Sequence, residues 1–258
     1  MVIRTKDAEG KTLSQIRRAK RERRKKRKKA VLLAMLMLGI CIGILFTPLF
    51  NLKEIDIEGN VRVDAKTIIE AGGFRLGENI FKFHLPKAGE GVASIPYINS
   101  VELQRRLPGK IEINVTECIP LAYVQCAGGM VVVDKDGKVL EKKDENVSHE
   151  IPILFDFKFE KYTLGKKINE NNDEKLKKTL EITKNLYNNN LIADVISITT
   201  TKGELCLNLK SGIRVILGNA EELDKKFTML QEVLKRLPEG AGGVIDARNP
   251  DKLYQRSE

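Results

Sequence analysis

The sequence predicts an α+β protein that one N-terminal helix anchors in a membrane. A dense basic cluster followed directly by an uncharged apolar stretch predicts the anchor. In the remaining chain, strand-like and helix-like patterns are mixed without the regular alternation that a parallel sheet requires, which predicts the α+β class. We expect residues 1–29 to form a basic tail, residues 30–50 a transmembrane helix, and the following residues a folded α+β portion.

The positive charge of the chain is concentrated in its first 29 residues. They contain 14 Lys and Arg against three acidic residues, whereas the other 229 residues carry 31 basic and 32 acidic side chains. Such a cluster can bind nucleic acid or act as a nuclear address, but its position beside an apolar stretch favours a topological role. We expect a cytoplasmic N-terminus, with about 1 kcal/mol of lipid attraction for each cation near the surface. The residues concerned are Arg23, Arg24, Lys25, Lys26, Arg27, Lys28 and Lys29.

The apolar stretch "AVLLAMLMLGICIGILFTPLF" occupies residues 30–50, and no charged residue falls between Lys29 and Lys53. As a helix rising about 1.5 Å per residue it would reach roughly 30 Å, the thickness of a bilayer's hydrocarbon core. A cleaved signal peptide has a shorter apolar region and a small-residue cleavage site, which this segment lacks. We predict an uncleaved single-pass anchor that leaves residues 51–258 outside the cytoplasm.

The first segment after the anchor has the pattern of a strand, two helices and two further strands. A strand over 52–57 precedes a helix that Asp64 caps and that Gly72-Gly73 ends, and a weaker helix follows around 89–95. Two strands then flank Pro108-Gly109. Their apolar residues all have odd numbers, so a connection of three or five residues is needed to keep them on one face. These residues are Val101, Leu103, Ile111, Ile113 and Val115.

The later part of the chain is predicted to combine short strands with two helices. Strands are expected over 121–126, 130–133, 138–140 and 151–157, and a three-stranded meander over 194–218. The first helix has Asn172 or Asp173 as its cap and carries Leu176, Leu180 and Tyr187 at helical spacing. The second begins at Asn219 in a capping box with Glu222. Its apolar stripe is typical of core packing and comprises Leu223, Phe227, Leu230, Leu234 and Leu237.

One segment could be mistaken for a catalytic site. In "VVVDKDGKVL", residues 131–140, Asp134 ends a strand and Asp136 follows two residues later, as in phosphatases that form an aspartyl-phosphate. Those enzymes also need Thr at the position of Lys138 and a further acidic pair for magnesium, and neither is present. Asp-Gly between apolar runs is a strong hairpin signal, so we predict a turn at Asp134–Gly137.

Other residues that carry chemistry are sparse. Beyond the anchor, Cys118, Cys126 and Cys206 have no disulfide-framework spacing, and His84 and His149 have no cysteine partners at zinc-ligand spacing. No nucleophile elbow or phosphate-binding glycine loop occurs. We therefore predict a non-enzymatic protein with no cofactor, metal, nucleic acid or small-molecule substrate.

The order of these motifs resembles the bacterial cell-division family FtsQ, called DivIB in Gram-positive bacteria. The most specific motifs are I-x-x-E-G-N at 55–60, R-x-L-P-x-x-I-x-I-x-V-x-E-x-x-P-x-A at 105–122 and V-I-D-A-R at 244–248. Cys118 departs from the family, which usually has Arg after the Glu. The resemblance implies a POTRA domain at 51–122, a β domain of mixed α/β structure on an antiparallel-rich sheet at 123–250, and a tail at 251–258.

The resemblance also implies a function. Members are division scaffolds at the septum that bind FtsL and FtsB/DivIC-like proteins outside the cytoplasm and help control septal peptidoglycan synthesis, which makes a septal peptidoglycan synthase a further candidate partner. The alternative is a POTRA-bearing transport or assembly factor, although neither POTRA repeats nor a barrel-length array of strands is found. An aspartyl-phosphate phosphatase outside the cytoplasm is the third, disfavoured hypothesis.

The resemblance places partner binding at the last strand, where an exposed edge would accept a strand of the FtsB-like protein. An ordinary position inside the sheet remains the alternative. If the strand is an edge, Ala247→Pro should remove one donor and weaken partner binding without unfolding the domain. The implied residues are Val244, Ile245, Asp246, Ala247 and Arg248, with Leu253 and Tyr254 just beyond.

Overall fold

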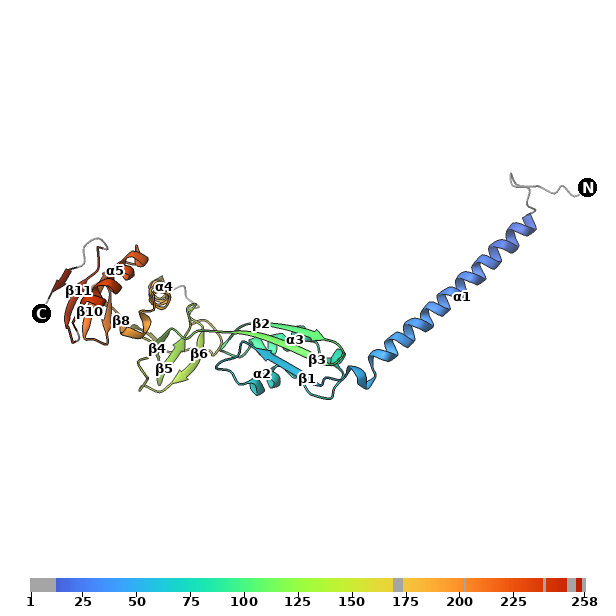
Figure 1. The fold of residues 1–258 in the computed structure, drawn as a ribbon, viewed down its shortest axis with the longest axis horizontal. Helices are drawn as coiled ribbons and strands as arrows, with labels where there is room; N and C mark the ends of the chain where they lie inside the picture. Colours follow the sequence, from blue (N-terminus) through green and yellow to red (C-terminus); the bar gives the residue numbers. More distant parts are fainter. Residues whose placement is uncertain (1–12, 169–173, 202, 239, 250–253, 257–258) are drawn as a thin grey trace, which may run out of the picture. The chain divides into compact units, whose positions relative to one another are not determined.

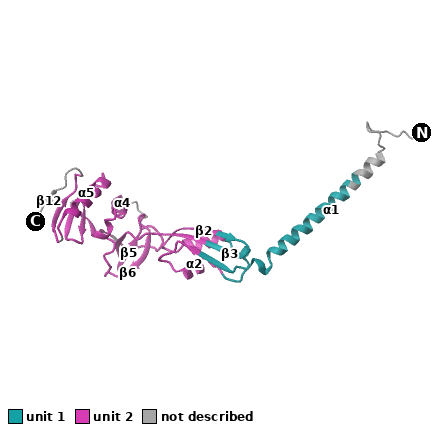
Figure 2. Ribbon diagram, viewed as in Figure 1, with its two compact units in different colours: residues 1–56, 75–84, 104–112 teal, residues 57–74, 85–103, 113–258 magenta. Residues whose placement is uncertain are grey.

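The computed structural model describes residues 13–168, 174–201, 203–238, 240–249 and 254–256. Two compact units are distinguished in the chain (Figure 2). One comprises residues 1–56, 75–84 and 104–112, and the other residues 57–74, 85–103 and 113–258. Helices and strands are mixed along the chain, as the sequence predicts (Figure 1).

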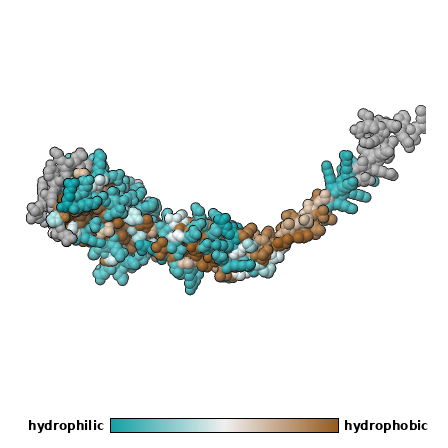
Figure 3. Space-filling view, in the orientation of Figure 1, coloured by the Kyte–Doolittle hydropathy of each residue, from teal (hydrophilic) through white to brown (hydrophobic). Residues whose placement is uncertain are grey.

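The predicted anchor is part of one long helix, α1 (Leu13–Leu45), whose section from Arg23 to Leu45 is long and apolar enough to cross a membrane. Figure 3 shows apolar residues along it, giving way to hydrophilic residues toward its N-terminal end. The helix ends five residues before the predicted limit of 50. Asn79 donates to the carbonyl oxygen of Leu45 at 2.8 Å and the Thr47 hydroxyl to that of Ile44 at 2.7 Å, and a 3₁₀ turn begins at Pro48.

A three-stranded sheet with order β1-β3-β2 follows. Its strands are β1 (Glu54–Glu58), β2 (Ile98–Arg106) and β3 (Lys110–Glu117), and the three residues between β2 and β3 confirm the odd-length connection predicted from the apolar pattern. Two helices, α2 (Ala65–Gly72) and α3 (Leu85–Ala93), lie between β1 and β2. Asp64 holds the predicted N-cap position of α2 but makes no side-chain cap bond.

Helix α3 begins four residues before the predicted position of 89. Its second residue is Pro86, whose fixed φ suits the first turn of a helix, so the start is set there and not at the glycines. Gly91 is needed for packing, because a Cβ on it would lie 2.1 Å from the carbonyl oxygen of Ala71 in α2. The two helices can therefore approach closely.

A nine-stranded mixed sheet forms the later part of the chain, with order β12-β11-β10-β9-β8-β7-β4-β5-β6. Five of its strand pairs are antiparallel and three, β4–β7, β7–β8 and β10–β11, are parallel, as expected for an antiparallel-rich sheet. The strands are β4 (Ala122–Cys126), β5 (Gly129–Val133), β6 (Val139–Lys143), β7 (Ile153–Phe159), β8 (Val195–Thr201), β9 (Glu204–Leu209), β10 (Ile213–Gly218), β11 (Gly243–Asp246) and β12 (Tyr254–Arg256).

Two helices contribute to the core of this sheet, and both differ in detail from the prediction. In α4 (Glu174–Asn188) the buried side chain near the end is Leu186, whereas Tyr187 is 40% exposed; the predicted caps Asn172 and Asp173 lie outside the described residues. Helix α5 (Leu223–Arg236) begins after Glu222, so the capping box predicted at Asn219 is wrong. Its buried apolar residues Leu223, Phe227 and Leu230 confirm the predicted stripe, with Leu234 and Leu237 partly buried.

Candidate partner-binding edge

The strand predicted to be the outermost, over Val244–Arg248, is the second from the edge. Strand β11 pairs with β10 on one side, in parallel, and with β12 on the other, antiparallel, with Val244 opposite Arg256 and Asp246 opposite Tyr254. No strand lies beyond β12 among the residues that the structure describes. The predicted edge is therefore corrected: Tyr254 belongs to the edge strand, Val244–Asp246 lie inside the sheet, and Leu253 is outside the described residues.

Ala247 is also placed differently from the prediction. It follows the end of β11, it is fully buried, and its backbone N–H donates to the carbonyl oxygen of Ile216 at 2.8 Å. Proline here would delete a hydrogen bond inside the sheet and not one offered to a partner. The premise that Ala247 offers its N–H to a partner is wrong, and Ala247→Pro is now expected to weaken the fold of the domain.

The register also indicates which backbone groups of β12 point outward. The N–H of Ala247 points toward β10. Because backbone groups alternate in direction along a strand, the N–H and C=O of Ile245 also point toward β10, whereas those of Val244 and Asp246 point toward β12. Their partners Arg256 and Tyr254 then face β11. The N–H and C=O of Gln255, between them, are left facing away from the sheet.

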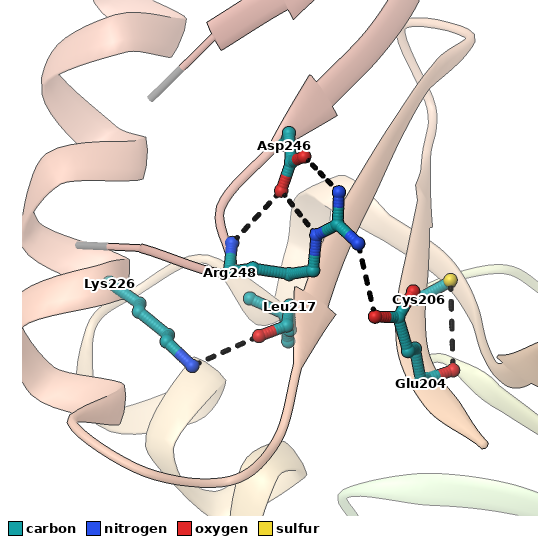
Figure 4. A network of polar contacts seen from close by, with 6 residues as sticks. All are labelled: Glu204, Cys206, Leu217, Lys226, Asp246 and Arg248. Carbon is teal, nitrogen blue, oxygen red and sulfur yellow. Dashed lines mark hydrogen bonds and ion pairs between the residues drawn. The ribbon is translucent and has the colours of Figure 1, made fainter. Parts of the chain in front are cut away.

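Arg248 holds the turn after β11 by polar contacts (Figure 4). Its backbone N and its Nε donate to Oδ1 of Asp246 at 3.2 and 2.9 Å, and one Nη donates to Oδ2 at 2.5 Å. The other Nη donates to Oε1 of Glu204, at the start of β9, at 3.2 Å. These hydrogen bonds, chiefly to Asp246, raise the pKa of the already permanently charged guanidinium. The two charged residues of the V-I-D-A-R motif, Asp246 and Arg248, are thus hydrogen-bonded to each other.

Gly218 makes room for this turn. It ends β10 with a φ of +71°, and a Cβ there would lie 2.9 Å from Cγ of Arg248. The β9–β10 ladder shifts register between Ile216 and Gly218, which bends the end of β10. A glycine is therefore required where the stem of Arg248 crosses the strand end.

Lys226, which the sequence did not single out, organises the loop between β10 and α5. Its side chain is 1% exposed, and Nζ donates to the carbonyl oxygen of Leu217 at 3.0 Å (Figure 4). Nζ also donates to the carbonyl oxygen and to Oδ1 of Asn219, each at 3.0 Å. Burial lowers the pKa of this lysine. Asn219 does not cap the helix because its side chain binds Lys226. Its burial could have been predicted from its position, because Lys226 falls within the i, i+3, i+4, i+7 apolar stripe of α5.

The opposite edge of the sheet, β6, is partly covered. The N–H of Val139 donates to the carbonyl oxygen of Lys166 at 2.9 Å, and its own carbonyl oxygen accepts from the N–H of Gly165 at 2.8 Å. The remainder of β6 carries Glu141, Lys142 and Lys143, and charged residues discourage strand addition at an edge. Among the described residues, part of the β6 edge is therefore already hydrogen-bonded and the rest is charged.

The turn at Asp134–Gly137 is confirmed. Asp134 is 4% exposed, and its Oδ1 accepts the backbone N–H groups of Asp136 at 2.8 Å and Lys138 at 2.9 Å. The Asp134 carboxylate, considered above as a nucleophile, thus stabilises the hairpin turn by accepting backbone hydrogen bonds. Across the described ranges, no group of three or more His, Cys, Asp or Glu side chains is placed to hold a metal ion.

The seven cations predicted to contact lipid lie together on α1. Arg23 to Lys29 are exposed and occupy consecutive helical positions directly before the apolar part of the helix. At about 100° per residue, seven positions make almost two turns, so the charges surround the helix axis. The helix is therefore not amphipathic here, and it has no apolar side with which to lie flat on a membrane.

Comparison with known proteins agrees with this architecture. Residues 50–117 match the POTRA domain of FtsQ type, and residues 122–248 match the C-terminal domain of the cell-division proteins FtsQ and DivIB. The chain belongs to the FtsQ/DivIB family. The three-stranded sheet with its two helices is thus a POTRA domain, and a mixed α/β sheet domain follows it.

Two similar proteins in this family cover most of the chain, and a third covers about a third of it. The cell-division protein DivIB of Clostridium botulinum is 31% identical over 221 residues, 84% of each chain, and that of Clostridium tetani is 27% identical over 213 residues. The FtsQ protein of Corynebacterium glutamicum is 32% identical over 93 residues, 36% of this chain and 42% of that one. Membership of a cell-division family favours the division hypothesis over a transport or assembly factor.

Proposed function

We propose that the protein is a non-enzymatic, single-pass membrane scaffold of the bacterial division machinery that binds partner proteins by strand addition at β12. Family membership supports the division role. The observation that carries the binding mode is that no strand pairs with the outer side of β12 among the described residues, at the end of a sheet whose other edge is partly covered and charged. An exposed strand supplies unpaired N–H and C=O groups that a second chain can use.

The proposed occupant is an extended segment of an FtsB/DivIC-like protein, with FtsL as a further component of the same complex and a septal peptidoglycan synthase as a third candidate. Strand addition would extend the sheet without rearranging the contacts of Arg248, Asp246 and Glu204. That network keeps the β11 turn fixed, which preorganises the edge and lowers the ordering cost of binding.

The binding mode makes a specific prediction at Gln255. Gln255→Pro should weaken binding of the FtsB/DivIC-like segment at least about tenfold, because it removes the outward N–H of β12 and leaves the bonds to β11 in place. The measurement is calorimetric titration of the full-length protein in detergent with the extracytoplasmic segment of its DivIC-like partner. Gln255→Ala, which keeps the N–H, is the matched control and should bind as the wild type does. Equal affinity of the two variants would sink strand addition at β12.

Localisation to the septum is the second prediction. A fluorescent protein fused to the N-terminus should form a ring at mid-cell before constriction begins, and it should be fluorescent because the proposed topology leaves the basic tail in the cytoplasm. Time-lapse imaging of dividing cells provides the measurement. A uniform membrane signal throughout the cell cycle would contradict the division role and favour transport or assembly.

The basic helix is proposed to fix this orientation and to contact anionic lipid. The support is geometric, since Arg23–Lys29 adjoin the span without a break in the helix and surround its axis. Phosphate groups of the cytoplasmic leaflet are the nearest anions that such a ring of charge would meet.

A further inference from the structure

The turn at Asp134–Gly137 is followed by Lys138, whose side chain contacts residues that are distant in the sequence. Lys138, the first residue after the turn, donates from Nζ to the carbonyl oxygen of Ile98, the first residue of β2, at 2.7 Å. The same Nζ lies 3.9 Å from Sγ of Cys118, which directly follows β3. One side chain of the β5–β6 hairpin therefore contacts the chain where β2 begins and where β3 ends. All of these residues belong to the same compact unit.

Asp134 fixes the direction in which Lys138 points. Its buried carboxylate accepts the backbone N–H of Lys138, and it also interacts with the Cys118 thiol. Burial, the largest cause, raises the pKa of that thiol to about 11, so the sulfur is a neutral packing group and not a reactive one. The Asp134–Lys138 pair is thus built to hold a contact and not to do chemistry.

Further contacts surround Lys138 at this junction. The N–H of Cys118 donates to the carbonyl oxygen of Tyr97 at 2.7 Å, and the Tyr97 hydroxyl donates to Glu141 of β6 at 2.8 Å. The apolar cluster here is small beside the main core of the nine-stranded sheet. Its buried members are Cys118, Tyr123, Val132, Leu140 and Ile153. Because apolar burial is non-directional, the orientation of the two sides of the junction depends on directional bonds such as those from Lys138 to Ile98 and from Tyr97 to Glu141.

We propose that Lys138 is a latch that makes residues 57–74, 85–103 and 113–118 move as one body with the sheet domain that follows them. With the latch closed, Ile98 and Cys118 are held on the β5–β6 hairpin. With it open, the short link at 119–121 becomes a hinge, since the Tyr97–Glu141 hydrogen bond and the small apolar cluster then oppose rotation without the directional bond from Lys138. The hairpin that resembles a phosphatase motif would then owe its acidic residue to this mechanical role. The inference is independent of the partner proposed above.

The test is a distance measurement across the junction. Thr67 in α2 and Gln125 in β4 are exposed and can be replaced by cysteine for spin labelling, in full-length protein in lipid nanodiscs. Cys41→Ser removes the exposed native thiol, and Cys118, Cys126 and Cys206 are buried. Lys138→Met should widen the electron–electron distance distribution about twofold relative to the wild type. Lys142→Met, an exposed lysine of the same hairpin, is the matched control and should leave the width unchanged.

Two further variants keep the result decisive. Lys138→Arg retains a cationic donor and should restore a narrow distribution, which a general loss of packing would not do. If Lys138→Met loses its cooperative thermal transition, Lys138→Gln, which keeps a neutral donor on a shorter stem, takes its place and should give an intermediate width. A folded Lys138 variant lacking the cation, with the width of the wild type, would overturn the latch.

Discussion

Replacing Glu117 by alanine is expected to lower the free energy of unfolding by roughly 2–4 kcal/mol. Its carboxylate accepts the backbone N–H groups of Val61 at 2.9 Å, Arg62 at 3.0 and 2.9 Å, and Val63 at 2.9 Å. Without it, three donors of the loop after β1 lose their acceptor, and hydrogen bonds to a charged group are among the stronger ones. Denaturant unfolding of the full-length protein in detergent, followed by circular dichroism, measures the loss.

Glu112 provides the control on the same strand. It forms an exposed pair with Arg106 at 2.8 Å, so Glu112→Ala should cost less than about 1 kcal/mol. Losses of equal size at the two positions would contradict the special role of Glu117.

The same carboxylate predicts a pH dependence. Burial opposes ionisation of Glu117, but the backbone hydrogen bonds from Val63, Arg62 and Val61 outweigh it and hold its pKa below the usual 4.5. Because the folded-state pKa is the lower one, the stabilisation is present above the unfolded-state pKa and is lost as the pH falls through the folded-state pKa. The difference in unfolding free energy between the wild type and Glu117→Gln should therefore shrink from about pH 6 to about pH 3. A constant difference would rule out the ionised form as the source.

Replacing Lys226 by alanine is expected to lower the free energy of unfolding by roughly 3–5 kcal/mol. Two effects add. The carbonyl oxygens of Leu217 and Asn219 and the amide oxygen of Asn219 lose their donor, and removal of a fully buried stem leaves a cavity. The same denaturant titration measures the change.

Lys226→Met separates the two effects, because it keeps the stem volume and removes only the amine. We expect a loss of about 1–3 kcal/mol for this variant. Lys225→Ala, at the exposed neighbouring position, should change stability by less than about 1 kcal/mol. A methionine variant as stable as the wild type would show that the hydrogen bonds of the ammonium contribute nothing net.

Local patterns predicted the features that depend on neighbouring residues. The parity of the apolar positions in β2 and β3 gave the three-residue connection, and Asp-Gly gave the β5–β6 turn. Both depend on which face a side chain occupies or on which φ a turn requires, and these are properties of a few consecutive residues. The anchor helix was predictable for the same reason.

The edge of the large sheet was not predictable in this way. Strand β12 has three described residues, too few for a period-two pattern, and its place beside β11 is set by the order of strands in the whole sheet. The predicted start of α5 was also wrong. Asn219 and Glu222 have the spacing of a capping box, but Lys226 from the next turn takes the Asn219 side chain. In the first case no local signal exists, and in the second a tertiary contact overrides one.

The parallel pairing of β10 with β11 has a consequence for biogenesis. Parallel neighbours cannot be joined by a tight turn, so β11 reaches its place only after α5 has docked as the crossover between them. Contacts of this kind close late, because the chain must first lose the entropy of a long loop. Strand β12 depends in turn on β11. The surface proposed for partner recruitment is thus assembled near the end of folding, and a chain in which β11 has not yet docked cannot display it.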